Sequence, residues 1–131
     1  MKDEAGSISL LLSMGALLFC LFALGVADLG SMLLARSRAQ SAADAAALAA
    51  VVQQTPVLGQ GSDPENAARA MAEANGASLV SCSCKVGDFR ATVEVTLAPR
   101  IVFVSGWRGR AVHATARAEV NPDVLTYRDP G

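Results

Sequence analysis

Few residues in this 131-residue chain have side chains suited to chemistry, and the first is its single histidine, His113. A catalytic histidine must be held against a nucleophile or a carboxylate, as in Ser-His-Asp arrangements. His113 instead alternates with apolar residues in a strand-like run, which places it on the polar, solvated side. Gly106 and Gly109, in the segment SGWRGR, lack the lysine and the following helix of a phosphate-binding loop. We therefore predict no catalytic residue, no enzyme activity, no cofactor and no small-molecule substrate.

Two cysteines, Cys82 and Cys84, form a C-x-C pair whose side chains point to one face of an extended strand. One pair without a second pair of ligands is weak support for zinc, so we expect no metal site. Three states stay open: reduced thiols, an internal disulfide in an exported domain, or an intermolecular bond or metal. An internal disulfide would be strained, because positions i and i+2 of a strand lie near the upper limit of Cα separation. Cys20 lies in an apolar run and is interpreted as a packing residue.

The only tryptophan, Trp107, is followed by Arg108 and Arg110 in a glycine-flanked loop. An exposed Trp beside Arg is a frequent anchor of protein interfaces. Trp107 and Arg108 are therefore candidates for contact with a partner or with lipid headgroups. The competing interpretation is a Trp107 that folds back onto a sheet.

The composition of the chain limits what kind of protein can position these residues. It is 52% hydrophobic and 18% charged, with a net charge of −1. These values exclude a disordered polar tail and a basic nucleic-acid binder.

The apolar residues are concentrated near the N-terminus, where no charged residue occurs between Glu4 and Asp28. The run Ile8–Ala27 has about 20 residues, the length that a helix needs to cross a bilayer. We predict a lipid-contacting membrane span with positions at Ile8, Leu12, Gly15, Phe19, Phe22 and Ala27. The alternative is a cleaved secretory signal, with Gly25 and Ala27 at −3 and −1 of the cleavage site.

The helix is expected to continue well past the span, because strong helix formers follow and no proline occurs before Pro56. One continuous helix from about Ser7 to about Gln54 would be about 70 Å long. A row of small residues at every fourth position predicts a groove for close packing against a partner helix. Its members are Ala23, Ala27, Ser31, Ala35, Ala39, Ala43 and Ala47.

The order and spacing of motifs along residues 5–52 resemble the N-terminal segment of TadE/TadG-like proteins of the tight-adherence (Flp) pilus systems. The residues that carry the resemblance are Asp28, Gly30, Arg36, Gln40, Asp44 and Leu48, the last two within AADAAALA. The resemblance implies a single-pass protein of the bacterial cytoplasmic membrane with a cytoplasmic N-terminus and an extracytoplasmic C-terminal domain. It also implies a minor pseudopilin or assembly component whose partners are other pilin-like or pilus-assembly membrane proteins. Incorporation of the protein into a pilus is one of the roles that the resemblance implies.

Two features depart from that pattern. Arg36 and Arg38 follow the span while only Lys2 precedes it, and positive-inside counting alone favours a cytoplasmic C-terminus. Pilin-like precursors are usually cut after a glycine with glutamate five residues on. Here the fifth residue after Gly6 is Leu11.

After a linker over 55–63, the sequence predicts a helix from Pro64 to Ala74. Ser62 and Glu65 fit a capping box at its start, and Asn75-Gly76 is a typical helix stop. Ala68, Met71 and Ala72 are expected to face inward.

Strands are predicted at Ala77–Cys84, Phe89–Ala98 and Ala111–Val120, with the short apolar run Ile101–Val104 as a further strand or a surface patch. The second strand alternates with an inward face of Phe89, Ala91, Val93, Val95 and Leu97. The third has an inward face of Val112, Ala114, Ala116, Ala118 and Val120.

We therefore expect an α+β, pilin-like fold: a long N-terminal helix with a small helix and a three- or four-stranded antiparallel sheet. The expected organisation is an anchor and extended helix over 1–54, a linker over 55–63, a head domain over 64–120 and a loose tail over 121–131. The favoured function is a non-enzymatic, membrane-anchored pseudopilin or assembly component. The alternatives are a secreted soluble binding protein with a cleaved signal, and an envelope redox or metal protein that uses Cys82 and Cys84.

Overall fold

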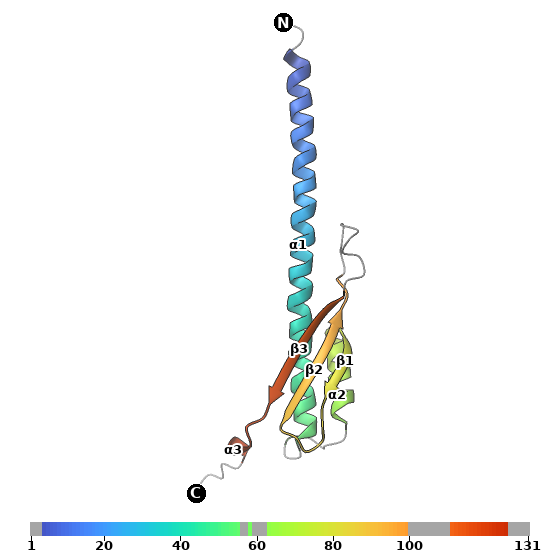
Figure 1. Ribbon diagram of the computed structural model, residues 1–131, viewed down its shortest axis with the longest axis vertical. Helices are drawn as coiled ribbons and strands as arrows, with labels where there is room; N and C mark the ends of the chain where they lie inside the picture. Colours follow the sequence, from blue (N-terminus) through green and yellow to red (C-terminus); the bar gives the residue numbers. More distant parts are fainter. Residues whose placement is uncertain (1–3, 56–57, 59–62, 100–110, 126–131) are drawn as a thin grey trace.

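The computed structural model describes residues 4–55, 58, 63–99 and 111–125 and shows an elongated molecule (Figure 1). Helix α1 covers Glu4–Gln54 without a break, as the absence of proline predicts. Its 51 residues correspond to about 75 Å of helix. The N-terminal half of α1 projects alone, and the other elements pack against its C-terminal half.

Helix α2, Pro64–Ala74, has the predicted bounds, but its N-cap differs from the expectation. The cap is Asp63, whose Oδ1 accepts a hydrogen bond from the backbone N–H of Asn66 at 3.0 Å. The predicted capping box at Ser62 and Glu65 is wrong by one position, because proline favours the first helical residue and the cap then directly precedes it. Asn75 caps the C-terminus, and Gly76 follows with a φ of +75°, as the sequence predicts.

Three strands form one antiparallel sheet in the order β1-β2-β3. Their bounds are Ser78–Ser83 for β1, Arg90–Leu97 for β2 and Val112–Glu119 for β3. Val93 in β2 lies opposite Cys82 on one side and Ala116 on the other. The expected α+β arrangement of a long helix, a short helix and an antiparallel sheet is confirmed. The run Ile101–Val104 lies outside the described residues.

The core lies between the C-terminal half of α1, helix α2 and the inner face of the sheet, and it consists mainly of alanine and valine. Ala68 and Ala72 of α2 are fully buried there as predicted, but Met71 is 41% exposed. The small side chains let α2 lie close against α1, and a buried Met71 would hold the helices apart. Phe89, also predicted inward, is 39% exposed just before β2 begins. The remaining inward positions of β2 and β3 are buried or partly buried, as the alternation predicts.

The C-terminal end of α1 carries a buried polar side chain. Gln54 is fully buried, and among the residues that the structure describes neither its amide nitrogen Nε2 nor its oxygen Oε1 has a hydrogen-bond partner. Its backbone carbonyl accepts a hydrogen bond from the N–H of Gly87 at 2.9 Å, which ties the β1–β2 turn to the end of α1. Gly87 has a φ of +94°, a conformation that favours glycine.

The first residues after β3 form a short helix that the sequence does not predict. A single-turn helix, α3, covers Pro122–Leu125, where the sequence analysis expects only a loose tail. Asn121 explains the turn, since its Oδ1 accepts a hydrogen bond from the N–H of Asp123 at 3.0 Å. Residues 126–131 lie outside the described part of the chain.

Candidate assembly interface on the long helix

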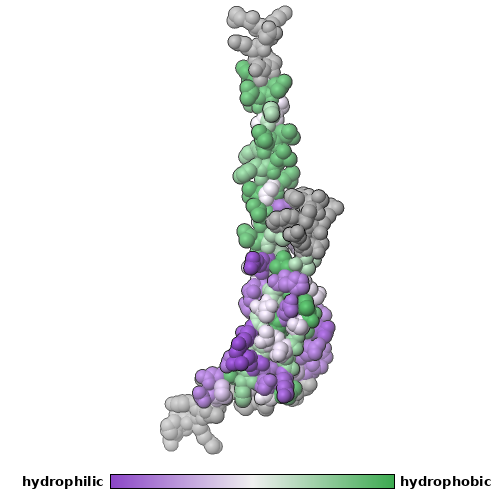
Figure 2. Space-filling model, in the orientation of Figure 1, coloured by the Kyte–Doolittle hydropathy of each residue, from purple (hydrophilic) through white to green (hydrophobic). Residues whose placement is uncertain are grey.

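The N-terminal half of α1 exposes almost all of its apolar side chains. Every residue from Ile8 to Leu24 is exposed, and the predicted span positions Leu12, Phe19 and Phe22 are among them. Figure 2 shows this continuous apolar surface above a head that is mostly polar outside. Within the described residues, α1 is the one helix long and apolar enough to cross a membrane.

The row of small residues along α1 meets two different environments. Ala23 and Ala27 are exposed, and Ser31 is partly buried. Ala35, Ala39, Ala43 and Ala47 are buried in the core of the same chain, at 5% exposure or less. The expectation that the whole row faces a partner helix is therefore wrong for its C-terminal half. Close helix packing does occur there, but the neighbours are α2 and the sheet.

The opposite side of α1 remains uncovered by the head. Leu34 and Leu48 are 51% and 59% exposed, and Ser37 and Ser41 between them are exposed as well. These four residues, with Gly30, follow a spacing of three, four or seven positions, which keeps them on one straight stripe of a helix. We call Gly30, Ser37, Ser41 and Leu48 the outer stripe, whereas Leu34 also borders the ends of α2 and β2. The every-fourth-residue row does not reveal this stripe, because that row winds around the helix by about 40° per step.

The polar motif residues of α1 have distinct surroundings. Gln40 donates hydrogen bonds through Nε2 to Oδ1 of Asp44 at 3.1 Å and to the backbone oxygen of Thr115 in β3 at 3.4 Å. This side chain therefore fastens α1 to the edge strand β3. Asp28 is buried at 5% exposure, although it follows the apolar run, while Arg36 is exposed. The motif thus combines a buried carboxylate near the end of the apolar run with a polar link to the sheet.

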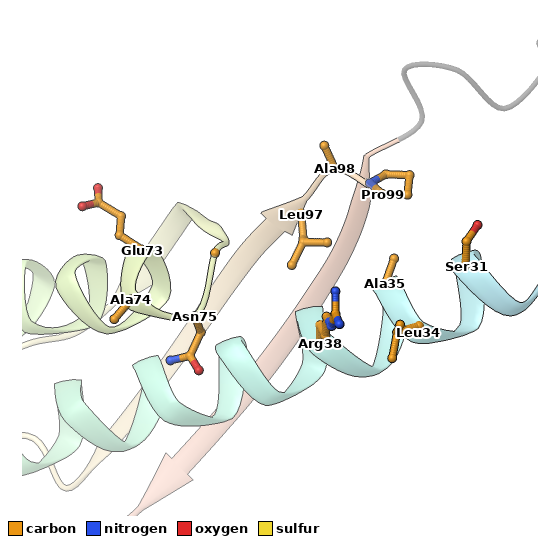
Figure 3. Close-up of a pocket in the computed structure, with 11 residues that line it drawn as sticks. Ser31, Leu34, Ala35, Arg38, Glu73, Ala74, Asn75, Leu97, Ala98 and Pro99 are labelled. Atoms are coloured by element: carbon orange, nitrogen blue, oxygen red, sulfur yellow. The ribbon is translucent and has the colours of Figure 1, made fainter. Parts of the chain in front are cut away.

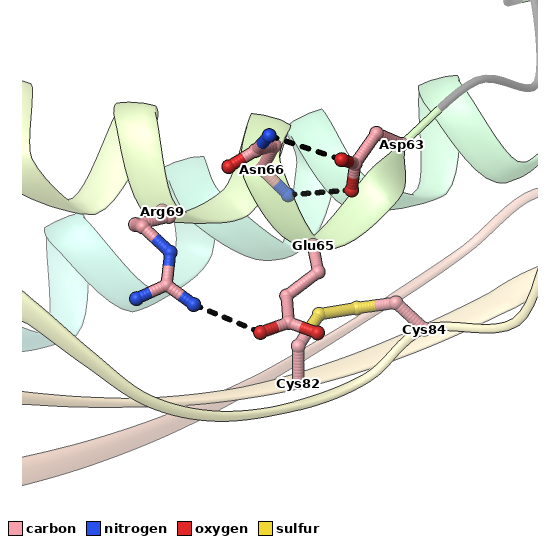
Figure 4. Close-up of polar contacts among 6 residues, drawn as sticks. All are labelled: Asp63, Glu65, Asn66, Arg69, Cys82 and Cys84. Carbon is pink, nitrogen blue, oxygen red and sulfur yellow. Dashed lines mark hydrogen bonds and ion pairs between the residues drawn. A yellow bond between two sulfur atoms is a disulfide. The ribbon is translucent and has the colours of Figure 1, made fainter.

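The cysteine pair forms a disulfide at the end of β1, beneath α2 (Figure 4). The Cα atoms of Cys82 and Cys84 are 5.3 Å apart, well inside the usual range for a disulfide. The separation is shorter than the strand geometry predicts because Cys84 lies just beyond the last residue of β1. Both residues are partly buried and pack against the core. Above them, Glu65 and Arg69 of α2 form an ion pair at 2.9 Å.

The outer face of the sheet carries exposed ion pairs across neighbouring strands. Nδ1 of His113 lies 3.2 Å from Oε1 of Glu94, and His113 is solvated as predicted. Nε of Arg90 donates to Glu119 at 3.1 Å, and Arg117 contacts the same carboxylate at 3.4 Å.

The hydrogen bond and the positive charge of Arg90 lower the pKa of Glu119, and the same contact raises the pKa of Arg90. In the part of the chain that the structure describes, no group of histidine, cysteine or carboxylate side chains could hold a metal ion. Trp107 and Arg108, the predicted partner contacts, lie outside that part.

Comparison with known protein families identifies one that matches part of this chain. Residues 6–54 match the Tad family, described as Flp pilus-assembly TadE/G-like. No curated protein and no solved structure matches the chain. The matched segment coincides with α1, from its third residue to its last residue. Residues 6–54, the long helix with its exposed apolar half and its outer stripe, are therefore a TadE/G-like Flp pilus-assembly domain.

Proposed function

We propose that this protein is a membrane-anchored, non-enzymatic pseudopilin or assembly component of a Flp-type pilus, with its head on the extracytoplasmic side. The observation that carries the proposal is the coincidence of the family match with α1, whose apolar half and outer stripe are both left uncovered by the other residues that the structure describes. A helix that only supported the head would not need either surface. The helix therefore has surface available for lipid and for a partner at the same time.

Anchoring by α1 agrees with its continuity. The helix passes through Ala27 and Asp28 without a break, so the cleavage site of a secretory signal would lie inside a helix. The exposed side chains from Ile8 to Leu24 also require apolar surroundings, because such a surface is far larger than the apolar patches that soluble monomers expose. Lipid supplies those surroundings if the segment spans the membrane.

The extracytoplasmic placement of the head is supported by its disulfide. Disulfides form and persist in oxidising compartments and are rare in the bacterial cytosol. The Cys82–Cys84 bond therefore favours export over the cytoplasmic placement that the count of positive residues suggests. The bias in that count is small, and only Arg36 and Arg38 on α1 produce it.

The outer stripe is the part of α1 that we assign to other pilus components. Its small members, Gly30, Ser37 and Ser41, allow a neighbouring helix to approach closely, and the exposed Leu48 supplies apolar contact. The straight spacing of the stripe suits a helix that runs alongside α1 over several turns.

The proposal is tested by a charge on the outer stripe. Leu48→Glu should leave the head folded, because Leu48 is exposed, yet it should sharply reduce the number of pili and the recovery of crosslinked pilus proteins. The matched control is Val86→Glu, which places the same charge on an exposed apolar residue of the β1–β2 turn, away from the stripe. Equal piliation in the two variants would contradict the assigned surface.

A further inference from the structure

A cavity of about 560 Å³ lies where α1 enters the head, between α1, the C-terminal end of α2 and the end of β2 (Figure 3). Its lining includes Ser31, Leu34 and Arg38 from α1, Asn75 after α2, Leu97 at the end of β2 and Ala98 just after it. The volume is within the range of small-molecule sites.

The cavity lies at the depth of lipid headgroups if the apolar half of α1 spans the membrane. Ser31 and Arg38 lie about 5 Å and 15 Å beyond Asp28 along the helix axis. The polar headgroup layer is about 5–8 Å thick on each side of the hydrocarbon. The flexible Arg38 side chain can reach several ångströms back toward that layer. The near end of the cavity is therefore inside the layer, and the backbone of Arg38 lies about 7 Å or more beyond it, a gap that the Arg38 side chain must bridge.

The lining changes from apolar to cationic with distance from the span. Leu34 is half exposed, and seven positions before it on the same side of α1 lies the exposed Ala27 at the end of the apolar run. One turn further, Arg38 points from α1 toward the cavity, whereas the carboxylate of Glu73 points away from it. Among the residues that the structure describes, Arg38 forms no ion pair. An apolar entry followed by a guanidinium matches the order of acyl chain, glycerol and phosphate in a phospholipid that lies along α1.

We propose that this cavity binds the glycerol-phosphate part of a membrane phospholipid, with the guanidinium of Arg38 on the phosphate and Leu34 against the start of the acyl chains. The inference rests on the proposed anchoring of α1, but not on a role in pilus assembly. A bound lipid would hold the head at a fixed height above the membrane surface.

The test uses the full chain in a neutral detergent and phosphatidylglycerol as the probe, with lipid adducts counted by native mass spectrometry. We expect one retained phosphatidylglycerol per protein, and adducts about tenfold weaker in Arg38→Gln, since a hydrogen bond to a charged group is lost. Ala98→Phe should cause a similar loss by filling the cavity without a change in charge. The matched control is Arg36→Gln, on the other side of α1, which should bind as the unmodified protein does.

Three results would overturn the proposal. Equal binding by Arg36→Gln and Arg38→Gln would show general attraction to positive charge, and equal retention of diacylglycerol with the same chains would show that the phosphate is not recognised. Full displacement by millimolar inorganic phosphate would assign the site to a free anion. Piliation is not measured in this experiment, so a failure of the Leu48→Glu test would leave its result unaffected. Alkaline carbonate extraction of membranes from the same cells shows independently whether α1 is embedded.

Discussion

Ala43→Leu is expected to destabilise the head rather than to disturb only a partner contact. Ala43 is fully buried between α1 and the rest of the head, and its neighbours in the core are themselves close-packed small residues. The substitution adds three carbon atoms where there is no free space. Extra methylene groups in a packed core typically cost about 1–3 kcal/mol. The free energy of unfolding of a native domain is about 5–15 kcal/mol in total, so this loss is a large share of it.

Pulse proteolysis of the full chain in detergent, over a range of urea concentrations, measures this loss. A cost of about 2 kcal/mol lowers the urea midpoint by about 1 M or more for a small domain. Ser41→Leu is the matched control, because Ser41 is on the same helix but exposed, and leucine is the better helix former. An unchanged midpoint for Ala43→Leu would refute the assignment of this position to the chain's own core and would restore it as a partner-facing residue.

Two further predictions concern stability. Gln54→Met should raise the free energy of unfolding by about 1–3 kcal/mol, because it removes a buried amide without partners at similar volume, and a lower urea midpoint would contradict this reasoning. The Arg90–Glu119 pair should stabilise the head slightly at neutral pH, because Arg90 lowers the pKa of Glu119 below its ordinary value of 4.5 in the folded state. This contribution to stability is fully present above pH 4.5 and is lost as the pH falls through the lower folded pKa. The difference in urea midpoint between the natural chain and Glu119→Gln should therefore vanish in acid. It should also shrink in high salt, because salt screens the charges. A difference that grew on acidification would contradict the sign of this pKa shift.

The helices and strands could be predicted because their signals are local. Pro64 and Gly76 delimit α2, and the strict alternation around Val93 and Ala116 fixes the inner faces of two strands. The family resemblance likewise depends on a contiguous segment, residues 6–54.

The side of α1 that the head covers could not be predicted. The buried positions of α1, such as Ala35, Ala39 and Ala43, recur at helical spacing, but a row of small residues suits contact with a partner helix as well as contact with the chain's own head. Met71 and Phe89 show the same difficulty, since a large apolar residue is a natural candidate for burial. Here the close approach of α1, α2 and the sheet leaves room mainly for alanine and valine. The cavity beside Arg38 is equally invisible in the sequence, because it is formed by three elements distant along the chain.

The central claim is that α1 anchors the protein in the membrane and continues outside it into the head. In spheroplasts, the disulfide is opened with a membrane-impermeant reductant, Cys82 and Cys84 are labelled with an impermeant maleimide, and the membranes are then washed with alkaline carbonate. The account predicts that the labelled protein stays in the membrane pellet with residues Ile8–Ala27 still attached, as read by mass spectrometry. A labelled fragment that begins at Asp28 in the supernatant, or labelling that appears only after lysis, would contradict it.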